Sequence, residues 1–115
     1  MKRIMLLIVV TATFMVSCES RTYADISVPV ANPTYEANVK PVINANCSTS
    51  GCHNQGATFP PLTNYSEVKS YATSSNSEFL CKINAQCGVM PESGKMDQGT
   101  VDMINKWAQQ GYVEK

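Results

Sequence analysis

The stretch CSTSGCH, residues 47–53, contains two of the five cysteines of this chain and its only histidine. Thiols and imidazoles are the side chains that bind soft metals and attach prosthetic groups, and here three of them share one short segment. The residues between the cysteines are all small, and Gly51 leaves the backbone free to turn. Any fold of this chain must therefore gather two sulfur atoms and one imidazole at one place.

Three interpretations of this segment are open. Cys47 and Cys52 can form a disulfide beside a surface histidine, the segment can supply zinc ligands, or it can attach a haem whose iron binds His53. Zinc needs four ligands, so with a single histidine the others must be cysteines, which brings in Cys81 or Cys87. A thiolate cluster of this kind is readily lost to disulfides in an oxidising compartment, so zinc fits poorly.

The position of the histidine favours haem over a plain disulfide. In a haem-attachment site the residue after the second cysteine is the iron ligand, whereas a disulfide gives no reason for His53 to follow Cys52 directly. The usual spacing is Cys-x-x-Cys-His, and here four residues separate the thiols. Because Ser-Thr-Ser-Gly is small and flexible, the longer bridge can bulge and both thiols can still reach one macrocycle.

The N-terminus has the pattern of an export signal. Lys2 and Arg3 precede an uncharged apolar run, Ile4–Val16. A helix of that length spans ~20 Å, too short for a hydrocarbon core of ~30 Å. A basic start, a short apolar run and a small residue before a break are typical of a secretory signal. We therefore expect an exported protein, in which disulfides are permitted.

The apolar run ends in FMVSC, residues 14–18, which resembles the lipobox of bacterial lipoproteins. Met15 stands where that signal most often has leucine. The resemblance implies that residues 1–17 are removed as a signal peptide and that Cys18 is lipidated. A diacylglycerol with an amide-linked chain exceeds what stable membrane attachment requires. The alternative is an ordinary signal peptide cleaved nearby.

The charge balance of the mature chain excludes nucleic acid as an expected partner. The full chain has nine basic and nine acidic residues. Removing Lys2 and Arg3 with the signal leaves seven basic residues, a net charge of about −2. No basic stripe remains to neutralise phosphates. The remaining length allows one small domain, of a size that often needs a staple or a cofactor to complete its core.

The mature chain divides into a tether and a domain. Residues 18–33 are mixed polar with no sustained period and read as a tether. Residues 34–115 form the domain, in which a short amphipathic helix is expected mainly after Val39, running into the cysteine motif. Pro41 can start this helix or kink a longer one.

The later helices are expected to be short until the last. Ser66 can cap a helix through Ala72, and residues 78–83 can form another helical piece. Asp97 is a plausible N-cap for the last helix, and Gly111 suits its C-terminal end. That helix places four apolar residues on one face: Val101, Ile104, Trp107 and Ala108. No segment alternates as a strand does, so the predicted fold class is all-α. The loops are long for so small a domain, which is uncommon unless they wrap around something or are stapled.

A second axial ligand is expected from the segment CGVMPESGKM, residues 87–96. Met90 precedes a proline, which pushes it towards an extended conformation, so that its thioether points sideways from a loop. A thioether is a soft ligand that raises the reduction potential of haem iron. Met96 and Met103 are rivals, but Met96 reads as a staple beside the Asp97 cap, and Met103 reads as part of the core.

Taken together, these features resemble the small class I c-type cytochromes. The order is NVKPVINANC and GCH, then Leu62 and Tyr65, then MP, then a terminal helix containing MINKWAQQGY. The likeness is to lipoprotein cytochrome c domains of Bacteroidetes type, which carry a Cys-x4-Cys-His haem site. It covers roughly residues 35–113, most of the mature chain, and its specificity lies in the combination.

The resemblance implies a cytochrome c-like fold with crossing N- and C-terminal helices around one covalent haem c. Cys47 and Cys52 would form the thioethers, with His53 as proximal and Met90 as distal iron ligand. Packing against the haem would come from Leu62, Tyr65 and Trp107, although ordinary core packing explains the two aromatic residues equally well.

Cys81 and Cys87 are not required by the resemblance. A disulfide between them would close a small ring just before Met90 and stiffen the segment that aims its thioether. The alternatives are a redox-active pair and free thiols.

The function expected from the sequence is electron transfer by a membrane-anchored monohaem cytochrome on the periplasmic or cell-surface side. It would exchange electrons with redox partner proteins and would not be an enzyme, because no catalytic triad or carboxylate pair is readable and His53 is used by iron. One alternative is a disulfide-stapled lipoprotein without haem that acts as an interaction module. Another is a haem enzyme or gas sensor, if Met90 leaves the iron open.

Overall fold

The computed structural model of this chain describes residues 29–115. The predicted signal peptide, Cys18 and most of the predicted tether lie outside them. The described part is helical and contains no strand, which confirms the all-α class for that part. None of its helices is both long and apolar enough to cross a membrane. The elements are η3 (Tyr35–Val39), α2 (Lys40–Asn46), α3 (Tyr65–Thr73), α4 (Phe79–Ile83) and α5 (Gln98–Gln109).

The first two elements form one continuous helical segment. Thr34 caps it through its hydroxyl, which accepts a hydrogen bond from the Ala37 N–H. The first turn is a π-helix, and the regular α-helix begins at Lys40 with Pro41 as its next residue. Proline is tolerated at a helix start, so the expected helix after Val39 is confirmed, with a wider turn in front of it.

Helix α5 was predicted most fully. The Asp97 carboxylate accepts a hydrogen bond from the Thr100 N–H at 2.9 Å and so caps the helix. Val101, Ile104 and Trp107 are fully buried along one face. Gly111 follows the last turn with φ of 85°, the left-handed conformation that glycine adopts at helix ends.

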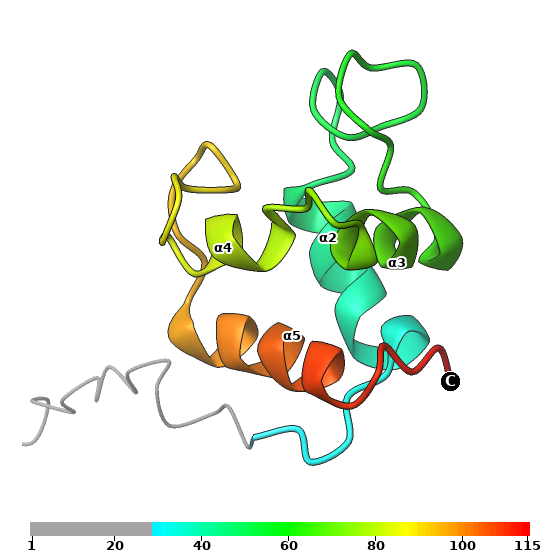
Figure 1. The fold of residues 1–115 in the computed structure, drawn as a ribbon, viewed down its shortest axis with the longest axis vertical. Coiled ribbons are helices and arrows are strands. Elements are labelled where there is room, and N and C mark those ends of the chain that lie inside the picture. The colour runs from blue at the N-terminus through cyan, green and yellow to red at the C-terminus, as the bar shows by residue number, and fades with distance from the viewer. Residues whose placement is uncertain (1–28) are drawn as a thin grey trace, which may run out of the picture.

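The N- and C-terminal helical segments are in contact. Helix α5 packs on η3, and the chain after α5 bonds back to it: the Tyr35 N–H donates to the Val113 carbonyl at 2.9 Å. The Trp107 indole N–H donates to the same carbonyl at 2.8 Å. In Figure 1, α5 runs along the bottom of the domain, α3 and α4 lie above it, and η3–α2 rises towards a loop at the top.

Helix α3 begins at Tyr65, two residues earlier than a cap at Ser66 would place it. Asn64, not Ser66, is the N-cap, and its side-chain oxygen accepts from the Glu67 N–H at 3.0 Å. Both residue types cap helices well, so the pattern alone does not choose between two candidates two positions apart. The expected helical piece near residues 78–83 is α4, with an ion pair between Lys82 and Glu78.

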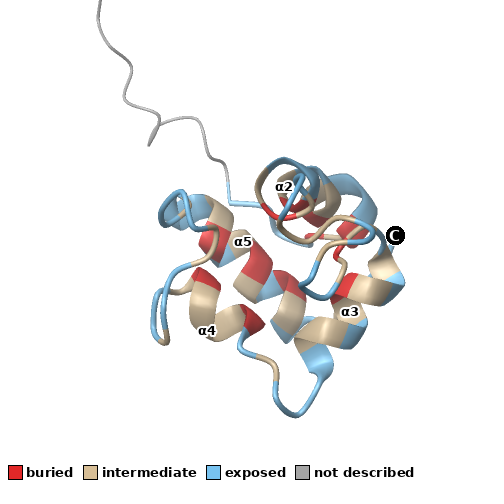
Figure 2. Ribbon diagram, turned by 90° about the horizontal axis from the view of Figure 1, so that it is seen from above, coloured by how far each residue is buried: buried red, intermediate tan, exposed pale blue. Residues whose placement is uncertain are grey.

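Buried apolar side chains from all the helices meet in one core. Figure 2 shows the buried residues on the sides of the helices that face each other. Met103 packs against this core, as was expected of it, and so does Met96. The core residues are Tyr35, Val39, Ile43, Cys47, Leu62, Val68, Phe79, Ile83, Ile104 and Trp107.

Replacing Asp97 with alanine should destabilise the domain by about 1 kcal/mol, because two α5 donors, the Thr100 N–H and hydroxyl, lose their acceptor. Urea unfolding measures this change. Asp102→Ala removes the same charge from an exposed position of α5 and should stay within about 0.5 kcal/mol of the parent. Equal losses in the two variants would contradict the capping role.

Candidate functional site

An open cavity of about 250 Å³ lies between the 47–62 loop, α3, α4 and the loop after α4. Its volume is close to the lower end of small-molecule pockets, ~300 Å³. The cavity brings together five residues predicted from the sequence: Cys47, Cys52, His53, Leu62 and Met90. Its other lining residues are Asn46, Gly51, Phe59, Pro60, Tyr71, Phe79, Lys82, Ile83, Pro91 and Glu92.

The cysteine–histidine segment turns back on the end of α2. Cys47 is the C-cap of that helix, and the His53 N–H donates to the Cys47 carbonyl at 3.0 Å. The Cys52 N–H donates to the Thr49 carbonyl within the turn, and Gly51 has φ of 80°. The longer spacing between the cysteines is therefore taken up as a closed turn, and His53 lies beside the helix end that carries the first thiol.

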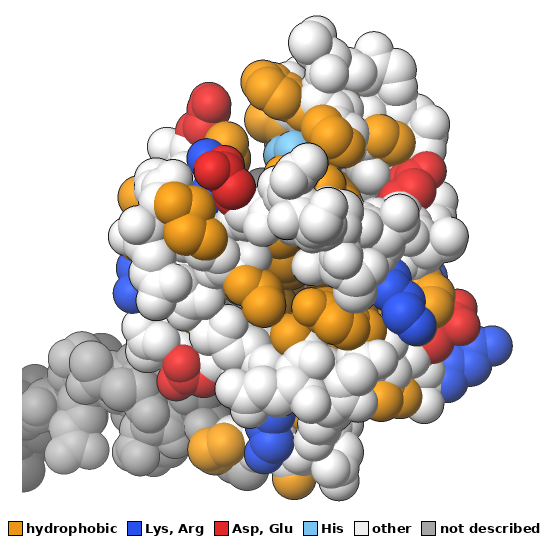
Figure 3. Space-filling model, in the orientation of Figure 1, with side chains coloured by type: hydrophobic (Ala, Val, Ile, Leu, Met, Phe, Trp, Pro, Cys, Tyr) orange, Lys and Arg blue, Asp and Glu red, His pale blue; other side chains and the backbone are white. Residues whose placement is uncertain are grey.

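The imidazole of His53 is held by one short hydrogen bond. Its Nδ1 lies 2.7 Å from the Pro60 carbonyl oxygen. A carbonyl can only accept, so Nδ1 must carry the proton, and in the neutral ring Nε2 then keeps its lone pair. Phe59 and Tyr71 flank the ring, with centroids 5.8 and 6.3 Å from it. The histidine, pale blue in Figure 3, reaches the surface among hydrophobic side chains.

A polar network ties the His53 loop to α3. The Glu67 carboxylate accepts from the Thr63 N–H at 2.8 Å, from the Thr63 hydroxyl at 2.7 Å and from the Gln55 side chain at 2.8 Å. The bonds from Thr63 are the main cause that holds the pKa of Glu67 below its usual value. Between these residues, the Leu62 N–H donates to the His53 carbonyl at 2.8 Å. The loop is therefore pinned on both sides of Pro60.

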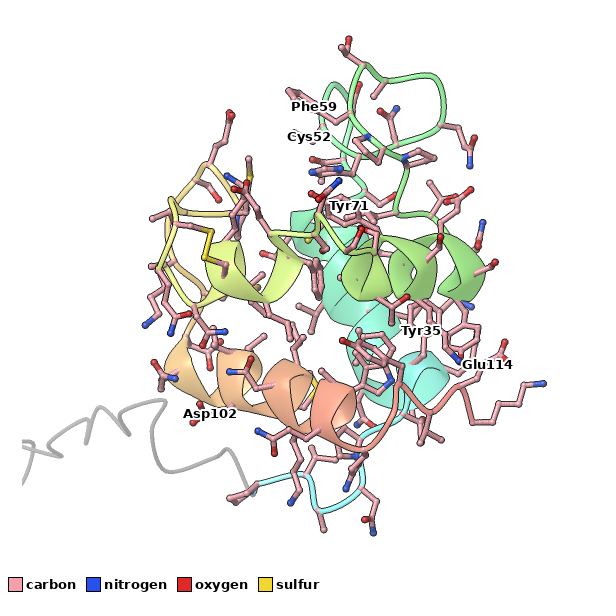
Figure 4. The ribbon with its side chains drawn as sticks, viewed as in Figure 1. Tyr35, Cys52, Phe59, Tyr71, Asp102 and Glu114 are labelled. Atoms are coloured by element: carbon pink, nitrogen blue, oxygen red, sulfur yellow. A yellow bond between two sulfur atoms is a disulfide. The ribbon has the colours of Figure 1, made fainter. Side chains whose placement is uncertain are left out.

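Cys47 and Cys52 are both free thiols in this fold. Cys47 is buried, and burial, aided by the nearby Cys52, raises the pKa of its thiol to about 11. Cys52 is partly exposed and lies near Phe59 at the top of the domain, above Tyr71 (Figure 4). The thiols therefore differ in access although they face one cavity.

Met90 reaches the cavity from the loop that follows α4. Its N–H donates to the Lys82 carbonyl at 3.3 Å. Cys81 and Cys87, the predicted pair, are bonded through their sulfur atoms, with Cα atoms 5.5 Å apart (Figure 4, yellow). The disulfide and the backbone bond thus both anchor the Met90 loop to α4.

Two of the predicted packing residues lie away from the cavity. Trp107 is fully buried in the core between Tyr35 and Tyr112, with ring centroids 6.1 and 4.9 Å away. Tyr65 packs on Tyr35, and its hydroxyl donates to the Tyr112 carbonyl at 2.8 Å. Their polar atoms are bonded to the C-terminal tail, so both residues fasten that tail instead of lining the cavity.

The most informative residues that the sequence analysis missed are Pro60 and Lys82. Pro60 acts through a backbone carbonyl, which has no side-chain signature, and the Pro-Pro pair indicated only a loop. Lys82 reads as an ordinary helix cation until α4 is placed against the cavity. Tyr71 and Phe79 were missed as well. They belong to two different helices, and their sequence spacing does not show that both line one cavity.

No protein-family profile, curated protein or solved structure matches this chain. Within residues 29–115, no cluster of three or more His, Cys, Asp or Glu side chains is arranged to hold a metal ion.

Glu67→Gln should destabilise the domain by about 1 kcal/mol at pH 7, because the amide accepts fewer of the bonds that the carboxylate accepts. Since the pKa of Glu67 is lowered in the fold, its contribution is complete above the usual glutamate pKa and is lost as pH falls through the lowered value. Urea unfolding of both proteins across that range should show the difference shrinking on acidification.

Glu114→Gln is the matched control, because Glu114 is exposed and its side chain makes no hydrogen bond within residues 29–115. A difference for Glu67→Gln that persists unchanged at low pH would contradict the role given to its carboxylate.

Proposed function

We propose that this protein is an electron carrier: a monohaem c-type cytochrome with His53 and Met90 as axial ligands, held at a membrane by a lipid on Cys18. The observation that carries the proposal is the grouping of two free thiols, one imidazole and one thioether around a single cavity, with the imidazole Nδ1 bonded to the Pro60 carbonyl.

Each of these side chains suits a role in binding haem c. Cys47 and Cys52 would hold the group through thioether bonds, which require free thiols. His53 presents Nε2, because its other ring nitrogen is occupied, and an outer hydrogen bond of this kind orients metal-bound histidines. The porphyrin supplies four nitrogen ligands itself, so two protein ligands complete the iron.

The haem would supply a reversible one-electron change at iron, and the protein would set the potential at which it occurs. Met90 would favour the reduced state, because a thioether is a soft ligand. Phe59, Tyr71 and Phe79 give the cavity apolar walls, which lower the local dielectric. The Pro60 bond keeps the imidazole in one orientation and one tautomer.

The setting that fits this function is the periplasmic or cell-surface side of a bacterial membrane, with redox proteins as partners. The disulfide between Cys81 and Cys87 supports an oxidising compartment. Together with the basic and apolar start of the chain, it favours export of the domain.

The competing function, an interaction module stapled by two disulfides, predicts a bond between Cys47 and Cys52. The fold keeps these two thiols free while it joins Cys81 to Cys87. Haem attachment uses both free thiols and the adjacent imidazole, and therefore accounts for more of the site.

Production of the chain alongside a cytochrome c maturation system tests the proposal. The purified protein should give a reduced-minus-oxidised visible spectrum of c type, and its intact mass should include one haem after extraction with acid and acetone. Cys47→Ser with Cys52→Ser should lose this covalent haem. Colourless protein, or haem that washes out, would reject the proposal.

Met90→Ala should lower the midpoint potential and open the iron to carbon monoxide, because the thioether that stabilises the reduced state is gone. Potentiometry and a carbon monoxide difference spectrum measure the two effects. Met96→Ala is the control, since Met96 lies in the same connection between α4 and α5 but packs against the core. A parent protein that already binds carbon monoxide as Met90→Ala does would instead indicate an open-iron enzyme or sensor.

A further inference from the structure

Lys82 is the cationic side chain of the cavity wall. The residues around it are mainly apolar, and of the cavity-lining residues, all within 29–115, Lys82 is the one lysine or arginine. The side chain keeps 27% of its surface exposed, so most of it packs against the protein. A charge beside an apolar cavity acts on the cavity contents more strongly than one in open solvent.

The ion pair that Lys82 forms in this structure leaves its ammonium available to another carboxylate. Its Nζ lies 3.1 Å from Oε2 of Glu78, one helical turn earlier, and the Glu78 side chain is 58% exposed. Exposed pairs of this spacing contribute little, about 0.3–0.5 kcal/mol. A carboxylate inside the cavity can therefore take the ammonium from Glu78 at little cost.

The backbone and the side chain of Lys82 have separate roles. The Lys82 carbonyl accepts the hydrogen bond from the Met90 N–H, whereas its ammonium lies near Gly88, where an added Cβ would meet Nζ at 3.5 Å. Substituting the side chain changes the charge at the cavity and leaves the backbone anchor of Met90 in place. The two effects can thus be measured independently.

We propose that the Lys82 ammonium is the counter-ion for a carboxylate of the haem held in the cavity, and that its charge raises the reduction potential of the haem iron. This inference rests on the proposed function, because haem carries two carboxylate side chains. A buried carboxylate is costly unless a cation pairs with it. A positive charge nearby also favours the reduced iron, which carries one positive charge fewer than the oxidised iron.

The chain contains a matched pair for comparison. Lys40 and Glu36 form the same one-turn ion pair on the N-terminal helical segment, at 2.8 Å, and Lys40 does not line the cavity. Lys40→Gln therefore removes the same charge from the same kind of pair, but away from the site.

The experiment measures midpoint potentials of the full-length, haem-loaded parent and its variants by redox titration, with visible spectra to verify haem content and ligation. Lys82→Gln should lower the potential, Lys82→Arg should keep it close to that of the parent, and Lys40→Gln should change it much less than Lys82→Gln. A Lys82→Gln shift no larger than that of Lys40→Gln would overturn the inference while leaving the proposed function intact.

Glu78→Gln provides the second measurement if Lys82→Gln does not retain haem. It removes the competing carboxylate and should raise the potential, and an unchanged or lower potential would overturn the inference. A parent protein without haem would reject the proposed function itself, so the two failures are distinguishable.

Discussion

The hydrogen bond between Nδ1 of His53 and the Pro60 carbonyl is the contact on which the candidate site depends. It fixes the tautomer of the ring, leaves Nε2 with its lone pair and spans the loop that begins at the end of α2. Bonds on either side of Pro60 support it, from Leu62 to the His53 carbonyl and from Thr63 to Glu67. A surface loop held by these bonds thereby presents one nitrogen in one orientation.

The opposite wall of the cavity comes from a different part of the chain. Helix α4 carries Lys82, whose carbonyl anchors Met90, and the disulfide joins Cys81 to the loop in front of that methionine. The contact between α5 and η3 lies elsewhere and holds the domain through Tyr35 and Trp107. The residues that fasten the C-terminal tail therefore do not line the cavity, whereas four other core residues do: Cys47, Leu62, Phe79 and Ile83.

The structural features that could be predicted from the sequence are those that local patterns encode. The α5 cap at Asp97, its buried face and the turn at Gly111 follow from propensity and period, and all three are present. Motif chemistry selected the thiols, His53 and Met90 that line one cavity. Pro60 and Lys82 were missed because their roles depend on where a loop and a short helix lie in space. Trp107 and Tyr65 lie in the core and not at the cavity, and the sequence could not tell these two places apart because burial and contact with a cofactor leave the same aromatic signature.

The two walls of the cavity differ in how firmly the structure holds them. His53 is fixed by a short side-chain bond and by backbone bonds with Cys47 and Leu62, whereas Met90 has one longer backbone bond, at 3.3 Å, and the disulfide that closes its loop. The thiols also belong to the firm side, next to the end of α2. In the proposed cytochrome, the α2–α3 side would attach and orient the haem, while the α4 side would contribute a soft ligand and a charge. Because these are separate elements, substitutions on α4 would alter the electronic properties of the proposed site without loosening its attachment.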